Sequence, residues 1–257
     1  MRHHTLPAAL VAATALAVAC NSTTGLAELN PVAPTTIAST SPGASPTAGA
    51  TSLPGWYAAF GNGVTVALDG DEVVLRTPDV PDHPSPYFGT GSAMYEAPGA
   101  GMQVNPNRIA TQDITLRVPA SPAIGSATDT PMGPIGVAVN GVVFFNQYAA
   151  QRQPLTAEIR TFDRFNGHPA PGDLYHYHVE PLWLTAAGKD RLVGVLLDGF
   201  PVYGPEDAGA GAPADLDVCH GHVRATPEFP EGIYHYHTTS EPPYISGCFR
   251  GSRGSVG

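Results

Sequence analysis

Charged side chains are scarce in this chain of 257 residues. Only 13% of the residues are Asp, Glu, Lys or Arg, and Lys189 is the sole lysine. The net charge is −10 with neutral histidines. An acidic protein without basic clusters has little attraction for nucleic acid or anionic lipid, so we expect no nucleic-acid partner and favour cations instead.

Long helices and common catalytic motifs are also lacking. Helical periodicity is absent apart from a short turn expected after Pro205, whereas the chain contains 29 glycines and 27 prolines. No Gly-x-Ser-x-Gly elbow, phosphate-binding glycine loop or paired helix histidines of a zincin is present. Any enzymatic chemistry would therefore have to come from a bound metal.

No hydrophobic run is long enough to span a membrane, but the N-terminus has the features of a targeting segment. Arg2 precedes an apolar stretch over 6–17, and Ala17-Val18-Ala19 stands directly before Cys20. This arrangement resembles a bacterial lipoprotein signal, although Ala17 occupies a position where leucine is more usual. We expect residues 1–19 to be removed and Cys20 to be lipidated, with plain secretion as the alternative.

Residues 20–54 are expected to form a disordered tether, because they are Ser, Thr, Pro, Ala and Gly with a single carboxylate, Glu28. The folded domain then occupies 55–257. The expected location is the periplasm or cell surface, with membrane contact through the lipid anchor only.

The chain has only three cysteines. If Cys20 is lipidated, Cys219 and Cys248 form an even pair, and an oxidising compartment favours a disulfide between them. The alternative is that Cys219 serves as a thiolate metal ligand beside the neighbouring histidines.

The folded part contains three hairpin signals and several β-rich segments. Asp-Gly or Asn-Gly pairs divide the β-rich runs 64–75, 137–145 and 192–203. Further strands are expected near 114–118 and 157–162. We therefore predict an all-β or β-dominated α+β fold, as a single disulfide-stapled domain of short antiparallel strands and long loops.

The tetrapeptide Tyr-His-Tyr-His occurs twice, at 175–178 and 234–237, each time after a Pro/Gly turn. Along a strand, side chains alternate between faces, so each copy places two imidazoles on one face and two phenols on the other. Paired imidazoles at this spacing are suited to binding Zn, Cu, Ni or Fe. The predicted ligands are His176, His178, His235 and His237, and the two repeats could form one site or two.

Other residues are candidates for the same site. His168, His220 and His222 are additional possible ligands, each of which could equally be a turn residue. A ligating histidine normally donates its second N–H to an oxygen, so nearby carboxylates are expected to support the ligands. These carboxylates are Asp163, Asp173, Asp198 and Asp217. His83, in a proline-rich loop, is expected to be solvated or to clamp that loop.

Together these motifs resemble the bacterial YHYH-domain family. The resemblance rests on the doubled tetrapeptide and on segments 81–83, 105–107, 135–142, 167–169, 197–204, 215–219 and 247–251. It implies an exported, metal-associated domain without supplying a substrate. One departure from the family pattern is Arg164-Phe165-Asn166, where relatives often carry a cysteine.

Three functions remain open at this point. The first is an exported, membrane-tethered protein that binds a transition metal, copper or zinc. The second is a metal-dependent extracytoplasmic enzyme, either a hydrolase or a copper oxidase, which would need an open coordination position. The third is a cell-surface binding module that uses histidine and tyrosine rings without metal.

Overall fold

The computed structural model describes residues 52–257. Residues 1–51, which include the expected signal segment, Cys20 and nearly all of the tether, lie outside the described residues. The helical elements are η1 (Gly55–Ala59), η2 (Ala150–Arg152), η3 (Glu158–Thr161) and α1 (Leu182–Thr185). Within residues 52–257, no helix has the length and apolar character needed to cross a bilayer.

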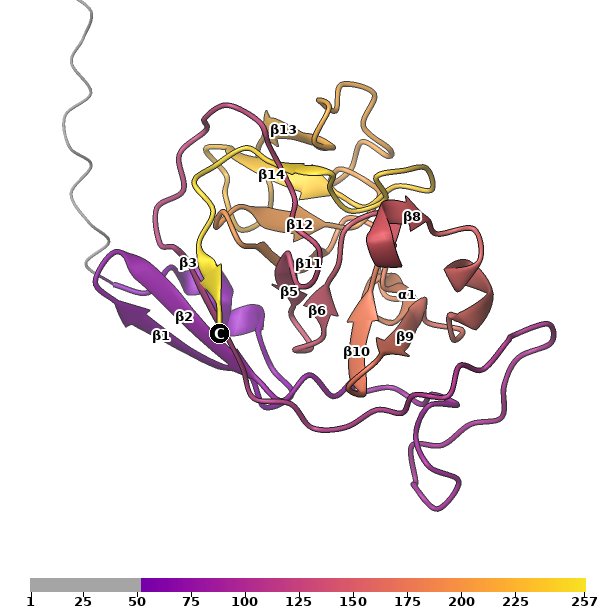
Figure 1. The fold of residues 1–257 in the computed structure, drawn as a ribbon. Coiled ribbons are helices and arrows are strands. Elements are labelled where there is room, and N and C mark those ends of the chain that lie inside the picture. Colours follow the sequence, from indigo (N-terminus) through magenta and orange to yellow (C-terminus); the bar gives the residue numbers. More distant parts are fainter. Residues whose placement is uncertain (1–51) are drawn as a thin grey trace, which may run out of the picture. The chain divides into compact units, whose positions relative to one another are not determined.

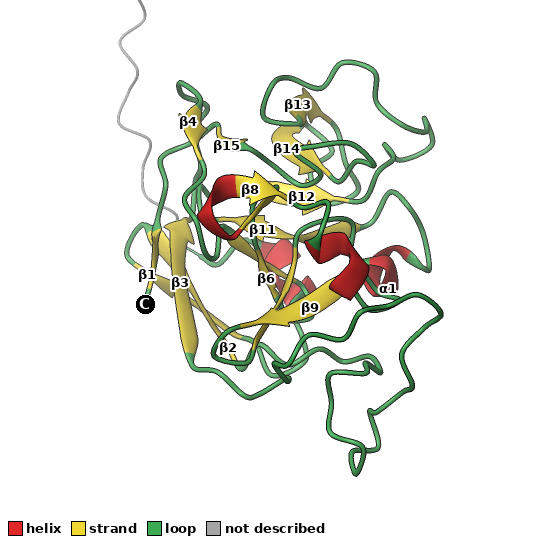
Figure 2. Ribbon diagram, turned by 45° about the vertical axis from the view of Figure 1, so that its right-hand side comes forward, coloured by secondary structure: helices red, strands yellow, loops and turns green. Residues whose placement is uncertain are grey.

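Between residues 52 and 257, sixteen short strands make up the β-structure, and long loops connect them (Figure 2). They are β1 (Thr65–Asp69), β2 (Glu72–Thr77), β3 (Ile114–Pro119), β4 (Thr128–Asp129), β5 (Gly136–Ala138), β6 (Val143–Phe144), β7 (Tyr148–Ala149), β8 (Gln153–Pro154), β9 (Gly167–Ala170), β10 (Leu174–Tyr177), β11 (Leu192–Leu196), β12 (Pro201–Tyr203), β13 (Gly221–Arg224), β14 (Ile233–His237), β15 (Cys248–Phe249) and β16 (Ser255–Val256). The β-dominated fold with short strands is thus as predicted.

The strands form one large sheet and three small ones. The eight-stranded sheet has the order β13-β14-β12-β11-β5-β6-β10-β9, and a four-stranded sheet has the order β1-β2-β3-β16. In Figure 1 the four-stranded sheet lies at the left, and the larger sheet runs from β13 at the top to β9 at the right. The pairs β4–β15 and β7–β8 form the remaining two sheets.

The three predicted hairpins are confirmed. They are β1–β2, β5–β6 and β11–β12, each antiparallel across its Asp-Gly or Asn-Gly turn. The strand at 114–118 is also confirmed as β3. The strand expected at 157–162 was wrong, because residues 158–161 form the 3₁₀ helix η3. Its Thr161 hydroxyl donates to the Glu158 carbonyl at 2.7 Å, a local bond that closes the turn.

The eight-stranded sheet consists of two equivalent halves. The first half contains β5, β6, β10 and β9 in that spatial order, and the second contains β11, β12, β14 and β13. In each half, a hairpin pairs in parallel with the last strand of a second hairpin, through β6–β10 and β12–β14. The halves meet where β5 and β11 pair antiparallel, with Val137 opposite Val195. The sheet therefore has an approximate twofold relation about this pair.

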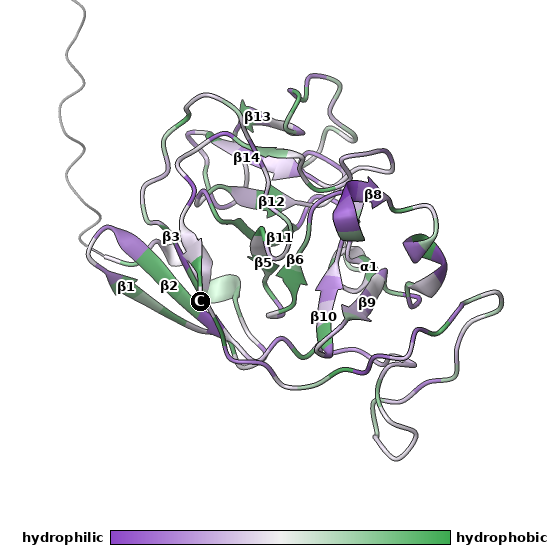
Figure 3. Ribbon diagram, viewed as in Figure 1, coloured by the Kyte–Doolittle hydropathy of each residue, from purple (hydrophilic) through white to green (hydrophobic). Residues whose placement is uncertain are grey.

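One continuous apolar core joins the two larger sheets. It contains Val73, Leu75 and Leu116 from the four-stranded sheet together with Val137 and Val195 from the centre of the other. Figure 3 shows the corresponding apolar colouring of β5, β6 and β11, in contrast to the hydrophilic colouring of β10. The inner strands are buried on both faces, so their sequences read as nearly continuous apolar runs.

Cys219 and Cys248 form a disulfide, as predicted. It joins the loop before β13 to β15 and spans 29 residues of sequence. Cys219 is therefore not available as a thiolate ligand.

Candidate metal centres

Three histidines come together on the β9–β10 hairpin. His168 on β9 lies directly opposite His176 on β10, and His178 follows two residues later on the same face. We call His168, His176 and His178 the first triad. All three are at least 95% buried, and their ring nitrogens lie within 4.8 Å of one another.

The β13–β14 hairpin repeats this arrangement. His222 on β13 lies opposite His235 on β14, and His237 follows two residues later. These three residues form the second triad, which is buried like the first. The strands β6, β5, β11 and β12 lie between β10 and β14, so the two triads are roughly 24 Å apart along the sheet at a strand spacing of about 4.8 Å. The two repeats therefore build two sites.

In the first triad, each ring is held through its Nδ1 atom. The Nδ1–H of His176 donates to the Leu174 carbonyl at 3.1 Å, and that of His178 to the Asn146 carbonyl at 2.5 Å. These carbonyl oxygens can only accept, so the proton is on Nδ1 in both rings. The Nδ1–H of His168 donates to the hydroxyl of Thr161 at 2.6 Å, because that hydroxyl gives its own proton to a carbonyl.

The second triad is held in the same way. His235 donates from Nδ1 to the carbonyl of Ile233 at 3.0 Å, and His237 donates from Nδ1 to the carbonyl of Gly204 at 2.7 Å. The Nδ1–H of His222 donates to a carboxylate oxygen of Asp215 at 3.0 Å. Oxygen acceptors of this kind are the usual partners of metal-binding imidazoles.

The Nε2 atoms consequently point inward with their lone pairs free. The separation is 2.9 Å between His176 and His178, and it is 3.1 Å and 3.2 Å from His222 to His235 and His237. Neutral His176 and His178 rings protonated at Nδ1 have no hydrogen to share across their contact. The Nε2 atom of His168 is buried without any partner. These lone pairs fit a cation at the centre of each triad.

Burial favours the neutral form of five of the six rings. It lowers the pKa of His168 to about 3, with the neighbouring His178 contributing, and that of His178 and His235 to about 4. The pKa values of His176 and His237 are lowered by the same cause. A neutral imidazole is the form that binds a metal, so these sites are prepared for a ligand role at neutral pH.

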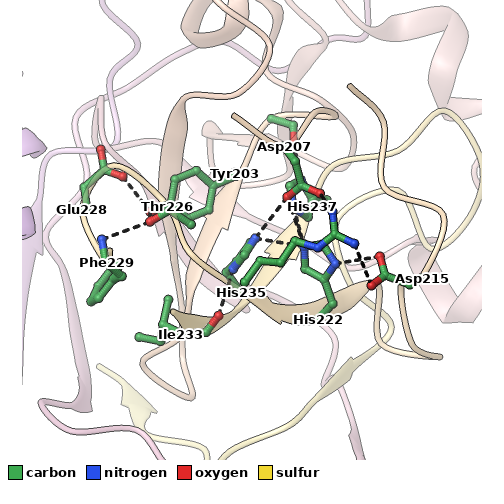
Figure 4. A network of polar contacts seen from close by, with 12 residues as sticks. Tyr203, Asp207, Asp215, His222, Thr226, Glu228, Phe229, Ile233, His235 and His237 are labelled. Atoms are coloured by element: carbon green, nitrogen blue, oxygen red, sulfur yellow. Dashed lines mark hydrogen bonds and ion pairs between the residues drawn. The ribbon is translucent and has the colours of Figure 1, made fainter. Parts of the chain in front are cut away.

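A carboxylate accompanies each triad, but the two differ in position. In the second site, Oδ1 of Asp207 lies 3.2, 3.8 and 3.3 Å from the Nε2 atoms of the three histidines. Figure 4 shows Asp207 converging with the histidines on one point. A tetrahedron with ligand bonds of about 2.0–2.1 Å has edges of roughly 3.3 Å, so these four atoms fit a tetrahedral ion.

In the first site, the carboxylate is Glu158 from η3. Its Oε2 lies 3.7 Å from Nε2 of His178 and 3.9 Å from Nε2 of His168. Partial burial raises its pKa, and the backbone N–H of Ala150 offsets part of that rise. Glu158 therefore stands at the edge of the triad, and the four atoms do not close a compact tetrahedron.

The surroundings of the two sites also differ. The first triad opens into a cavity of about 380 Å³, whereas the cavity beside the second has a volume of about 10 Å³. A single water molecule requires about 10–15 Å³. The second site is thus closed to anything larger than water, and the first has room for a small molecule.

A family model for the YHYH protein matches residues 115–212 and 206–251, a span of more than half the chain that includes both triads. The chain belongs to the YHYH family. Comparisons with curated proteins and with solved structures found no match.

The tyrosines of both YHYH repeats face away from the histidines, as their alternation predicts. All four lie in the core. Three of their hydroxyls donate to carboxylates that we expected beside the histidines. Tyr175 donates to Asp163 at 2.6 Å, and Tyr234 donates to Asp217 at 3.0 Å. The hydroxyl of Tyr236 donates to Asp198. The three aspartates therefore support the hairpins from the opposite face of the sheet.

Three further residues singled out in the sequence lie outside the two triads and make local structural contacts. His220 lies outside both triads, with φ +65° and with Nδ1 3.0 Å from the hydroxyl of Thr239. Asp173 lies in the turn before β10 and accepts from the backbone N–H of Arg108. His83 is fully buried, and its Nε2 lies 2.9 Å from the hydroxyl of Tyr177, so it clamps its loop onto β10.

The sequence did not reveal four residues of these sites. They are Glu158, Thr161, Asp207 and Asp215. Each comes from a loop or a 3₁₀ turn, where no periodic pattern fixes the direction of a side chain. Glu158 stands ten residues before His168 and Asp207 fifteen before His222, so no constant spacing marks them in the sequence.

Proposed function

We propose that this YHYH protein is an exported, lipid-anchored protein that binds two transition-metal ions, one in each histidine triad. The ions are copper or zinc, and the ligands are the Nε2 atoms of the triads together with Asp207 at the second site. The observation that carries this proposal is the common tautomer. All six rings place Nδ1 against an oxygen. Burial favours the neutral form of five of them, so the inward-facing Nε2 atoms of those five have no hydrogen to share.

The chemistry of the donor atoms supports this choice of metals. Imidazole nitrogen binds Zn, Cu, Ni and Fe, whereas Ca²⁺ and Mg²⁺ require mainly oxygen ligands. The nearly tetrahedral arrangement of Oδ1 of Asp207 and the three Nε2 atoms of the second triad is typical of Zn²⁺ sites. Export to an oxidising compartment, for which the Cys219–Cys248 disulfide is the supporting observation, agrees with a role in capturing such metals outside the cytoplasm.

Metal analysis of untagged, natively exported protein tests the proposal. The wild-type protein is expected to bind two ions per chain. The paired variant His176→Ala/His178→Ala and the paired variant His235→Ala/His237→Ala should each bind one, and the quadruple variant none.

A matched control separates the triads from other histidines of the domain. His220→Ala alters a histidine that lies outside both triads, so it should still bind two ions. Binding of less than one ion by the wild type, or an equal content in the wild type and the quadruple variant, would reject the proposal.

A metal-dependent enzyme is the second candidate, and it is favoured by the cavity beside the first triad. Catalytic zinc sites commonly combine three protein ligands with an open position, and such a metal activates bound water. Glu158 stands where it could accept a proton from a ligand in that position. The closed second site lacks the space for this chemistry.

A further inference from the structure

We infer that the two metal sites have different tasks: the first binds a small organic monoanion with an apolar body, and the second stabilises the fold. The inference rests on the proposed function, because the anion would bind through the metal at the first triad. It goes beyond that function because it assigns an organic ligand to the first site and none to the second.

The carboxylates differ in how firmly they are held. Arg224 donates to Oδ2 of Asp207 at 2.8 Å and to Asp215 at 3.0 Å, so one guanidinium fixes both acidic groups of the second site. The Asp207 side chain is only 7% exposed. With its other oxygen, Oδ1, directed at the three Nε2 atoms, Asp207 completes the set of four ligands and leaves no position for a further molecule.

Glu158 has no such restraint. Among residues 52–257, no Lys or Arg forms an ion pair with it, and its side chain is 31% exposed. Its Oε2 lies 3.7 Å or more from the histidine nitrogens. The first site therefore presents three close ligands, an open direction, and a carboxylate that can move toward or away from it.

The cavity at the first site fixes the kind of molecule that fits. Its volume of about 380 Å³ falls within the usual range of roughly 300–1,000 Å³ for ligand sites. The apolar part of its wall comes from Met132, Phe145, Ala150, Pro169, Ala170 and Pro171. A ligand with an aliphatic or aromatic body would bury that body against these residues.

The net charge of the metal-loaded first site indicates which chemical group the ligand would direct toward the metal. Within the described part of the chain, Glu158 is the only acidic residue lining this cavity, and no Lys or Arg lines it. Three neutral imidazoles, one carboxylate and one divalent ion have a net charge of +1. An organic monoanion, such as a carboxylate, neutralises this charge when it occupies the open position, and the cavity itself offers no competing cation.

Titration of the Co²⁺-loaded protein with benzohydroxamate and acetohydroxamate tests this inference. Both probes bind metals as monoanions, but only the first has a large apolar body. Calorimetry and the visible absorption of Co²⁺ report binding without requiring any activity. We expect one probe molecule per chain, with benzohydroxamate binding at least tenfold more tightly than acetohydroxamate.

The site variants assign the response to one triad. His235→Ala/His237→Ala keeps the first triad and should retain the spectral change, whereas His176→Ala/His178→Ala should lose it. Ala150 is exposed and lines the cavity, so Ala150→Phe should place a large ring inside it. It should keep both Co²⁺ ions while weakening benzohydroxamate at least tenfold, and Ala150→Ser, which changes the same position without filling the cavity, should bind like the wild type.

The outcomes separate this inference from the proposed function. A wild-type protein that binds neither Zn²⁺ nor Co²⁺ at the triads would reject the proposed function itself. Two bound ions with no probe binding, with binding at the second triad, or with the same affinity in Ala150→Phe as in the wild type would reject only the inference about the first site.

Discussion

Each triad histidine is fixed at one ring nitrogen and free at the other. The Nδ1 partners are backbone carbonyls for four of the rings, a threonine hydroxyl for His168 and a carboxylate for His222. Orientation by oxygen acceptors strengthens imidazole as a ligand. The residue types were evident from the repeated Tyr-His-Tyr-His, but the tautomers depend on carbonyls that only the folded hairpins bring into place.

The low pKa values predict how the metal-free protein responds to acid. Unfolded histidine has a pKa of about 6.5, whereas burial lowers that of His168 to about 3 and that of His178 to about 4. Between these pH values the unfolded chain binds more protons than the folded chain, so the free energy of unfolding must fall as the pH falls from about 6.5 toward 4. Each such histidine lowers the free energy of unfolding by about 1.4 kcal/mol per pH unit.

Urea unfolding of the metal-free protein at a series of pH values measures this slope. His178→Ala should reduce it by about 1.4 kcal/mol per pH unit relative to the wild type. A wild-type stability that stays constant from pH 6.5 to pH 4.5 would contradict the buried, neutral triads.

The glycines before His168 and His222 make room for a tyrosine of the same hairpin. A Cβ on Gly167 would overlap the phenol of Tyr175, and one on Gly221 would overlap the phenol of Tyr234. Gly167→Ala should therefore displace a buried phenol and destabilise the protein by about 1–3 kcal/mol in urea unfolding. Gly89→Ala has no neighbour within 4 Å and should change stability by less than about 0.5 kcal/mol. Equal effects of the two changes would contradict this packing.

At the scale of elements, the eight-stranded sheet is built from two pairs of hairpins. Asp163 accepts from Tyr175 and from the N–H of Gly167, and Asp217 accepts from Tyr234 and from the N–H of Gly221. The same bonds thus brace β9–β10 and β13–β14. Each hairpin carries one complete histidine triad, which explains why the two repeats form separate sites.

The junction of the two halves depends on close approach of β5 and β11. A Cβ on Gly136 would overlap the Val195 carbonyl, and a Cβ on Gly194 would overlap the Val137 carbonyl. Backbone atoms cannot yield as a flexible side chain can, so Gly136→Ala and Gly194→Ala should each cost about 2–4 kcal/mol of stability. Similar losses in both variants are expected from the twofold relation, and a neutral effect of either would contradict it.

The hairpins at the Asn-Gly and Asp-Gly turns were predictable because such pairs favour the turn geometry that joins antiparallel strands. The strand expected at 157–162 was wrong, because local bonding in a 3₁₀ turn outweighed its β-forming residues. The parallel pairing of β6 with β10 and of β12 with β14 was not predictable, since it joins segments without a local sequence signal. Glu158 and Asp207 were missed for the same reason.

At the scale of the whole domain, the two sites lie near opposite ends of one sheet and differ in access. The second is closed by Asp207 and Arg224, and the first opens into a cavity. A closed site with four ligands contributes its binding free energy to folding, because the unfolded chain does not preform it.

Metal removal should therefore have unequal effects on stability. A chelator is expected to lower the Tm of the wild type by several degrees, and more than half of that effect should disappear in His235→Ala/His237→Ala. The variant His176→Ala/His178→Ala should keep most of it, because the second site remains intact. Differential scanning calorimetry with and without chelator checks this, and an unchanged Tm in the wild type would contradict it.

A crystal structure of the metal-loaded protein with anomalous diffraction data tests the central claim most directly. Two anomalous peaks are predicted, one per triad, each about 2.0–2.1 Å from three Nε2 atoms, with Oδ1 of Asp207 bonded only to the second ion. No peak at either triad, or a single ion bound through Nδ1 atoms, would contradict the account.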